Sequence, residues 1–384
     1  MAKYRMILRR PRAAEPGLPN PGLPELGNPP LAEGMKKAGS GSGDFAGLFS
    51  RTMNCNAFSP RSRPSASILI VALLTGLIGP GFGSCASGQR PRAGLGSAAE
   101  LVLEPIARLG PGARKEISGI VRSRRDSTVF WTHNDSGDEP RIYPVRTDGS
   151  VVASERYPET PGTLVGGAIN CDWEDIALDA SGQIIIADFG NNSNSRRDLA
   201  LYFVEEPEVT EGRTSVTSKV LIRYPDQATF PAPRGDFNFD AEALFTVGDD
   251  VFVLTKHRSD TFTKLYRLDG RESGVLNPLT YLESFDIGGK VTGADASTDG
   301  LKLVILTYDR IWLFERDSAA TSFFAGRCAS VAYRMKDGPS DSEAICFENE
   351  RCLLIADEAK GSLYRVDLNV LERLPQTFRQ SSKP

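Results

Sequence analysis

The sequence predicts an all-β protein, a β-propeller of five four-stranded blades closed by an N-terminal strand. Three observations support this fold class. A unit of short apolar strands recurs five times between residues 100 and 375. The last unit lacks a fourth strand while a spare strand precedes the first unit, as ring closure requires. The 37 Gly and 25 Pro, with no long amphipathic helical repeat, favour strands joined by tight turns.

Each unit opens with a short apolar run, and most of these runs begin with acidic residues. The five openings are EISGIVRS (116–123), DWEDIALD (172–179), FDAEALFT (239–246), VTGADAST (291–298) and DSEAICFE (341–348). The spare strand before them is LVLEPIARLG (101–110). The openings are spaced by 56, 67, 52 and 50 residues, more than the roughly 40–50 residues of a compact blade. Six blades therefore remain the alternative.

The chain before residue 100 has a different character. Residues 1–64 include a Pro- and Gly-rich stretch that cannot bury enough apolar surface to offset its ordering entropy, so we expect disorder. Residues 65–85 contain an apolar run that follows arginines and ends at small residues and Cys85, which is typical of an export signal. Met53 lies just upstream, so we interpret residues 1–52 as a start-site artefact. A membrane anchor is the alternative.

The end of this signal, GFGSC, resembles a bacterial lipoprotein box and would make Cys85 a lipidated residue. Phe82 replaces the usual Leu, which leaves secretion without an anchor as the other outcome. Either outcome predicts an extracytoplasmic protein, which is periplasmic, membrane-anchored or secreted. We expect residues 86–99 to be a linker and residues 376–384 a tail.

The remaining cysteines are an even set, which fits export. Cys346 and Cys352 flank ENE in an expected hairpin, where a cross-strand disulfide is plausible, and Cys171 would then pair with Cys328. Buried thiols are the alternative. The spacing matches no CxxC metal or redox motif.

Charge excludes one class of partner. The formal net charge is −4 and the pI is about 5.5, with Lys and Arg scattered along the chain. A nucleic-acid-binding surface needs a basic stripe, so we expect no nucleic-acid partner. We expect a monomer.

The first strands carry the candidate metal ligands, because in a propeller they line the central channel. Aligning these strands places one ring of equivalent residues there, with acids two residues earlier in four units. The ring is Ser118, Glu174, Glu242, Asp295 and Glu343, and the earlier acids are Glu116, Asp172, Asp240 and Asp341. Such carboxylates either hold protons or bind a hard cation, Ca²⁺ before Mg²⁺. Solvated edge acids are the alternative.

The ends of the second strands carry the candidate catalytic groups. Aligning THND, ADFG, TKHR, TYDR and ADEA stacks His133, Asp188, Lys256, Tyr308 and Asp357. Chemically different groups at equivalent positions indicate a site. His133 is the candidate general base, oriented by Asp135 or Asp138, unless it is only a hydrogen-bonded turn residue. Lys256, His257 and Arg258 would bind an anionic group, with Lys256 and Tyr308 close to the chemistry.

Three motifs carry a family resemblance. HNDSG (133–137), DWEDIA (172–177) and DFGNN (188–192) resemble a family of exported bacterial β-propeller proteins. DAEAL (240–244) and DSEAI (341–345) are similar to the acidic motifs of phytase-like propellers, sometimes described as esterase-like. The resemblance covers roughly residues 100–370.

The resemblance implies a calcium-associated hydrolase of phosphomonoesters or other esters. It makes Lys256 and His257 contacts for the anionic substrate, and it makes cation ligands of Glu174, Asp188, Glu242, Glu343 and Asp357. The inferred channel mouth has few Lys and Arg, which argues against a highly phosphorylated substrate. The second hypothesis is a non-catalytic surface propeller whose loops 191–198 and 226–238 bind a protein or a glycan.

Overall fold

The computed structural model describes residues 100–339, 341–375, 377 and 378 of the chain. The predicted signal, Cys85 and the linker 86–99 lie outside the described residues, as does most of the tail. Within the described part, no helix is long and apolar enough to cross a membrane.

The strands form antiparallel meanders of four. The first two are β3 (Ile117–Arg122), β4 (Phe130–Asn134), β5 (Arg141–Val145) and β6 (Thr163–Gly166), then β7 (Trp173–Leu178), β8 (Gln183–Asp188), β9 (Ala200–Glu205) and β10 (Arg213–Arg223). The third contains β11 (Ala241–Val247), β12 (Asp250–Thr255), β13 (Phe262–Leu268) and β15 (Thr280–Asp286). The fourth contains β16 (Val291–Ala296), β17 (Lys302–Thr307), β18 (Arg310–Glu315) and β19 (Arg327–Met335).

The last meander is completed by the N-terminal end of the described chain. It contains β20 (Ser342–Asn349), β21 (Cys352–Asp357) and β22 (Ser362–Asp367), and β2 (Pro105–Arg108) pairs with β22 as its outer strand. The predicted closing strand is therefore confirmed. Its beginning forms a separate strand, β1 (Glu100–Leu103), which pairs in parallel with β19 of the neighbouring meander.

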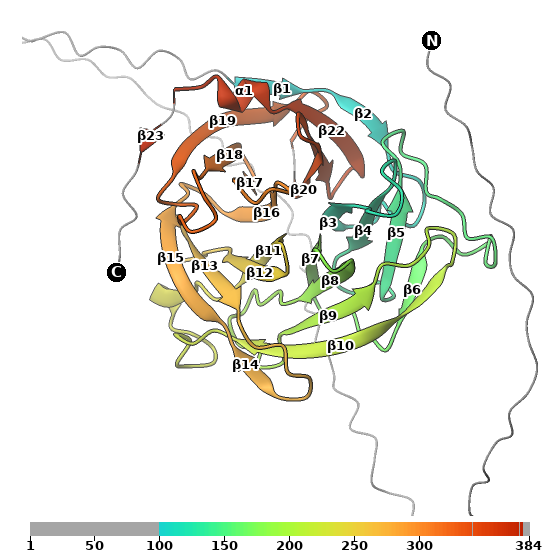
Figure 1. The fold of residues 1–384 in the computed structure, drawn as a ribbon, viewed down its shortest axis with the longest axis horizontal. Coiled ribbons are helices and arrows are strands. Elements are labelled where there is room, and N and C mark those ends of the chain that lie inside the picture. The colour runs from blue at the N-terminus through green and yellow to red at the C-terminus, as the bar shows by residue number, and fades with distance from the viewer. Residues whose placement is uncertain (1–99, 340, 376, 379–384) are drawn as a thin grey trace, which may run out of the picture. The chain divides into compact units, whose positions relative to one another are not determined.

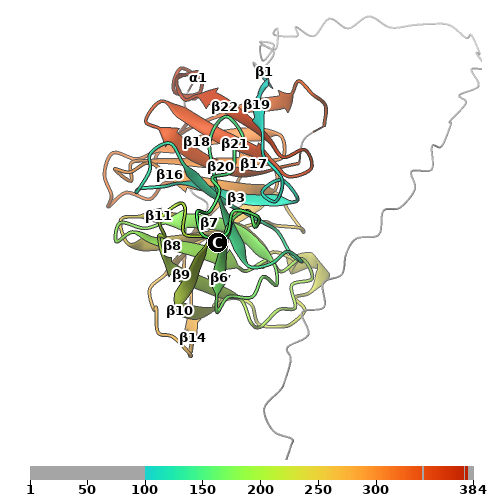
Figure 2. The ribbon, with the colours of Figure 1, turned by 90° about the vertical axis from the view of Figure 1, so that its right-hand side faces the viewer.

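The innermost strands form a closed ring. Each first strand contacts the next, from β3 through β7, β11 and β16 to β20, and β20 contacts β3 again. Figure 1 shows these strands around the centre, with β10, β15, β19 and β2 at the periphery. The side view in Figure 2 shows β8–β10 in the lower half of the ring and β17–β22 in the upper half. The predicted all-β propeller is confirmed.

Several shorter elements lie outside the meanders. β14 (Leu276–Pro278) pairs with β10, β6 also pairs in parallel with β10, and β23 (Thr377–Phe378) pairs with β19. The only helical turns in the described residues are η1 (Arg234–Asp236) and α1 (Asn369–Glu372).

The apolar core lies between adjacent meanders. One buried cluster joins β8–β10 to β11–β13, and it includes Ile185, Phe203, Val253 and Tyr266. Because every meander buries both faces, its middle strands read as nearly continuous apolar runs such as QIIIAD and DVFVLT. This packing holds the inner strands at the axis.

The predicted disulfides are not formed. Cys346 and Cys352 are thiols without a bridge, because Cys346 lies opposite Leu354 and Cys352 lies opposite Asn349 in the β20–β21 pairing. Cys328 is a buried thiol on β19, so it does not bridge to Cys171, which is disulfide-bonded elsewhere.

Candidate functional site

A β-bulge interrupts the beginning of every innermost strand. In each case one residue is left unpaired against the second strand, between two residues that are paired. These five unpaired residues are Ser118, Glu174, Glu242, Thr292 and Glu343. A bulge re-aims a side chain, and bulges commonly lie next to functional sites. The bulges thus place three buried glutamates at equivalent positions at one end of the ring of inner strands.

The alignment that placed Asp295 in this ring is wrong, because Thr292 occupies the equivalent position. Asp295 lies three residues further along β16, and its carboxylate accepts hydrogen bonds from the backbone N–H groups of Ala296 and Phe347, both at 2.8 Å. It therefore ties β16 to β20. Asp175 ties β7 to β11 in the same way by accepting from the N–H of Leu244 at 2.7 Å.

The predicted register at the ends of the second strands is also wrong in three places. The residues that pair with the starts of the inner strands are Asn134, Asp188, Thr255, Thr307 and Asp357. His133 therefore precedes the equivalent position by one residue, whereas Lys256 and Tyr308 follow it by one. His133 thus lies inside β4, whereas Lys256 and Tyr308 lie just beyond the ends of β12 and β17.

His133 lies in the core. Its side chain is 0% exposed, it packs edge-on against Trp173 with ring centroids 5.7 Å apart, and Gly119 leaves the space that its ring fills. Its Nδ1 lies 3.0 Å from the carbonyl oxygen of Asn134, not beside Asp135 or Asp138. Burial lowers its pKa to about 4, so the ring is neutral at pH 7.

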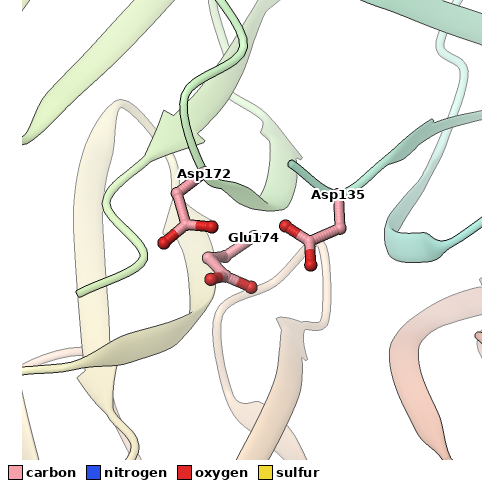
Figure 3. A group of neighbouring side chains, drawn as sticks. All are labelled: Asp135, Asp172 and Glu174. Carbon is pink, nitrogen blue, oxygen red and sulfur yellow. The ribbon is translucent and has the colours of Figure 1, made fainter. Parts of the chain in front are cut away.

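Two groups of three carboxylates meet at this end of the ring and share Glu174. One contains Asp135 and Asp172, the other Asp240 and Glu242, and within each group ligand oxygens lie within 4.8 Å of one another. Figure 3 shows Asp135 approaching Asp172 and Glu174 from the segment that follows β4. At Gly190 a Cβ would collide with the carboxylates of Glu174 and Asp172. The absence of a side chain there lets the acids pack against the backbone.

Burial and mutual repulsion shift the protonation of this cluster. Burial, with Asp172 nearby, raises the pKa of Asp135 to about 7. Burial also raises the pKa of Asp172 to about 6, against the opposing effect of Arg196. The pKa of Glu174 rises well above its usual range through burial and the proximity of Glu242. The cluster therefore either holds protons at neutral pH or needs a cation.

Lys256 lies at the centre of a second network. Its Nζ is 2.7 Å from Glu242 and 3.7 Å from Glu343, and it donates to the Tyr308 hydroxyl at 2.9 Å. Tyr308 in turn donates to Glu343 at 2.8 Å. Burial alone would lower the pKa of Lys256, but the two glutamates outweigh it and the pKa rises. The structure thus brings together Lys256, Tyr308, Glu242 and Glu343, all of which the sequence singled out.

Other predicted site residues have separate partners. Arg258 donates to Asp240 at 2.8 Å, and Arg196 lies 3.0 Å from Asp188. Asp357 accepts from the backbone N–H groups of Lys360 and Asp341 at 2.9 and 3.2 Å. His257 lies 2.6 Å from Asp260 and is buried. Asp188, Asp357 and His257 therefore have structural contacts, and neither carboxylate group includes them.

The alignment overlooked one acidic side chain in this region. Glu358 follows the strand-end position of β21 by one residue, as Lys256 and Tyr308 do in their meanders. Burial and the nearby Glu343 and Asp135 raise its pKa to about 8. Aligning the second strands by the inner-strand residues with which they pair would have identified Glu358. The sequence alignment used the small residue before each turn instead, and that residue does not mark the pairing.

The donor set is suited to a hard divalent cation. Seven carboxylates gather at this end of the ring of inner strands, and Lys256 and Arg258 pair with three of them. The seven are Asp135, Asp172, Glu174, Asp240, Glu242, Glu343 and Glu358. Glu174 is 3% exposed, and the one hydrogen bond described for its carboxylate is a 3.4 Å contact from Ser118. All-oxygen ligands without His or Cys favour Ca²⁺ or Mg²⁺ over transition metals.

Comparisons with known proteins find distant structural neighbours but no relative by sequence. No protein-family model matches the chain, and no curated protein matches its sequence. Its solved structural neighbours include a virginiamycin B lyase from Staphylococcus aureus, at 13% identity and a TM-score of 0.33 over 67% of this chain and 68% of that one. They also include the Cps50 (Swd1) β-propeller domain of Myceliophteria thermophila, at 10% identity and a TM-score of 0.37 over 68% of this chain and 98% of that one.

Proposed function

We propose that this protein is a calcium-binding β-propeller that hydrolyses a small anionic ester at the mouth of its channel. The observation that carries the proposal is the pair of carboxylate groups that share the buried Glu174. Without an ion, these carboxylates must hold protons to avoid repelling one another. A bound divalent ion would remove this repulsion and leave the carboxylates ionised.

The ligands that we assign to Ca²⁺ are Glu174, Asp135 and Asp172 in one group and Asp240 and Glu242 in the other. A bound ion would polarise an ester oxygen. Asp240 and Glu242 also pair with Arg258 and Lys256. We therefore assign the first position to the group around Asp135, whose three carboxylates form no ion pair within the described residues. We assign a supporting role to the other predicted ligands, which hold neighbouring groups in place through their hydrogen bonds and ion pairs. They are Asp188, Asp295, Glu343 and Asp357.

The anionic part of the substrate would meet Lys256 and Arg258, which lie beside the carboxylates, while His257 supports this segment through Asp260. Tyr308 orients Lys256 through its hydroxyl. We assign proton transfer to Glu358 in place of the enclosed His133. Its pKa of about 8 lets it hold a proton at neutral pH, and it is half-buried. The proposal also includes export, with Cys85 as a lipid anchor, and a monomeric state.

The test is calorimetric titration of Ca²⁺ into chelator-treated protein, followed by hydrolysis assays on p-nitrophenyl phosphate and p-nitrophenyl acetate with and without the ion. We expect stoichiometric binding and calcium-dependent turnover, both lost in Glu174→Gln. Glu155→Gln is the control because Glu155 is an exposed carboxylate away from the cluster. No binding by the wild type would refute the cation site.

The alternative is a non-catalytic surface propeller. Loops 191–198 and 226–238 form one preformed surface, because Asn194 accepts from Gln227 and Ala232 and also from the N–H of Phe239. Calcium binding that raises the melting temperature, without hydrolysis of either ester, would favour this alternative.

A further inference from the structure

Asp135 reaches the first carboxylate group from a different meander than its two neighbours. It directly follows β4, whereas Asp172 and Glu174 lie on either side of Trp173, the first residue of β7. Figure 3 shows the three side chains converging from these separate segments, and their oxygens lie within 4.8 Å of one another. Ionised carboxylates at this distance repel one another, more strongly when they are buried. Holding Asp135 at this position therefore requires contacts that offset the repulsion.

The side chain of Asn170 makes such contacts. Its Nδ2 donates to the backbone carbonyl oxygens of Asp135 at 2.8 Å and Asn134 at 3.2 Å. Its Oδ1 accepts from the backbone N–H of Trp173 at 3.2 Å. Within the described residues, the hydrogen bonds between residues 134–138 and the start of the second meander are those of Asn170. Asn170 therefore links the two sides of the carboxylate group.

Asn170 is itself fixed to the core of the second meander. The carbonyl oxygen of the preceding residue, Ile169, accepts from Nε1 of Trp173 at 3.0 Å, and the N–H of Ile169 donates to the hydroxyl of Tyr202 at 3.4 Å. Trp173 and Tyr202 are buried. Both N–H groups of the Asn170 amide and its oxygen are engaged, so a reversed amide would place its oxygen against two carbonyl oxygens. These contacts determine the orientation of the amide.

The other hydrogen bonds of the segment after β4 keep it within its own meander. The backbone N–H of Asp135 donates to the carbonyl oxygen of Glu116 at 2.7 Å. The side chain of Asn134 donates to Asp138 at 2.6 Å. These bonds orient the segment relative to β3 but do not fix its distance from β7. The bonds from Asn170 act across this boundary between the meanders.

We propose that Asn170 is a positioning residue that holds Asp135 within the first carboxylate group and thereby sets the calcium affinity of that group. The inference rests on the proposed cation site. Asn170 supplies no ligand, because its amide oxygen already accepts from Trp173. Without Asn170, Asp135 would move away from the carboxylates that repel it, and a binding ion would have to bring it back.

The first test is calorimetric titration of Ca²⁺ into the chelator-treated wild type and Asn170→Ala. We expect the variant to bind with unchanged stoichiometry and a dissociation constant about 10- to 100-fold higher, the usual effect of removing a group that orients a metal ligand. Asn170→Leu should behave in the same way, because it keeps most of the side-chain volume and loses all three hydrogen bonds. Wild-type affinity in either variant would overturn the inference.

Asn277→Ala is the matched control. Asn277 lies on β14, away from both carboxylate groups, and its side chain also donates to backbone carbonyl oxygens, including those of Glu272 at 2.9 Å and Leu221 at 3.2 Å. Both Ala variants should lower the melting temperature of the calcium-free protein, because each removes hydrogen bonds to the backbone. Only Asn170→Ala should weaken calcium binding. An equal loss of affinity in Asn277→Ala would show a general structural effect and would refute the positioning role.

A second measurement needs no calcium. Glu174→Gln is introduced into the wild type and into Asn170→Ala, and the melting temperatures are measured at pH 8 with a chelator. The gain expected from Glu174→Gln, which arises from repulsion within the cluster, should be smaller in Asn170→Ala, because Asp135 is then free to move away. Equal changes in both backgrounds would overturn the inference. A wild type that binds no calcium would refute the proposed cation site, while this comparison would still decide the role of Asn170.

Discussion

Replacing Glu174 by Gln tests whether the channel carboxylates repel one another in the calcium-free protein. The ligand oxygens of Glu174 lie within 4.8 Å of those of four other carboxylates. At this separation and an effective dielectric constant of about 20, each ionised neighbour contributes about 3 kcal/mol of repulsion. Protonation relieves part of this repulsion, because the pKa of Glu174 is raised by burial and by Glu242. We expect a net gain smaller than one such contribution, about 2 kcal/mol, at pH 8.

The assay is thermal unfolding of calcium-free protein at pH 8 and pH 5. A gain of about 2 kcal/mol should raise the melting temperature of Glu174→Gln by about 3–4 °C at pH 8. At pH 5 the gain should nearly vanish, because the wild-type cluster is then protonated. With Ca²⁺ the order should reverse, because the ion stabilises only a protein that binds it.

Glu242→Gln is the matched control, with the opposite expected sign. Glu242 is 2.7 Å from Lys256, and removing one member of a buried ion pair leaves the other uncompensated. This variant should lower the melting temperature at pH 8. A melting temperature of calcium-free Glu174→Gln below that of the wild type at pH 8 would refute the reasoning, because it would show that ionised Glu174 stabilises the fold.

Three further predictions concern pH, the buried lysine and the thiols. Calcium-free protein should lose stability from about pH 4.5 to about pH 8 and level off above that, because Asp135 and Glu358, with pKa values of about 7 and 8, keep protons in the folded state that the unfolded chain has already released. Ca²⁺ should flatten this slope, and a melting temperature that rises over this range would contradict the assignment. Lys256→Met should destabilise the protein by about 3–5 kcal/mol in denaturant unfolding, because Glu242 and Glu343 lose their shared cation, and an unchanged midpoint would be inconsistent with this network. Alkylation of unfolded, unreduced protein followed by mass spectrometry should label Cys346 and Cys352, which are not bridged, whereas unlabelled peptides would show a disulfide.

Much of the architecture could be predicted because it depends on local pattern. Apolar runs such as QIIIAD mark strands that are buried on both faces, and their fivefold recurrence indicates repeated meanders. The strand around residues 101–110 had no partner in its own neighbourhood, so ring closure was the remaining way to cover its edge. Glu174, Glu242 and Glu343 were aligned correctly because each follows an acid by two residues.

The errors arose where one residue of register decides the outcome. The spacing around His133 looked like that of Lys256, yet His133 precedes the strand-end position and Lys256 follows it. His133 lies within β4 and packs into the core beside Trp173, whereas Lys256 lies beyond the end of β12 and pairs with Glu242. Asp295 was misplaced for a similar reason, because the bulge in β16 is at Thr292.

The sequence by itself determined the strands, their repetition and the acidic character of the inner strand starts, because hydrophobic period and residue type are local properties. Only the tertiary structure decided which acids share one space. Asp135 follows β4 and Glu174 lies at the start of β7, and the closed ring and the bulges bring them within 4.8 Å of each other. Their raised pKa values follow from that proximity and from burial, which arise only when distant segments pack together.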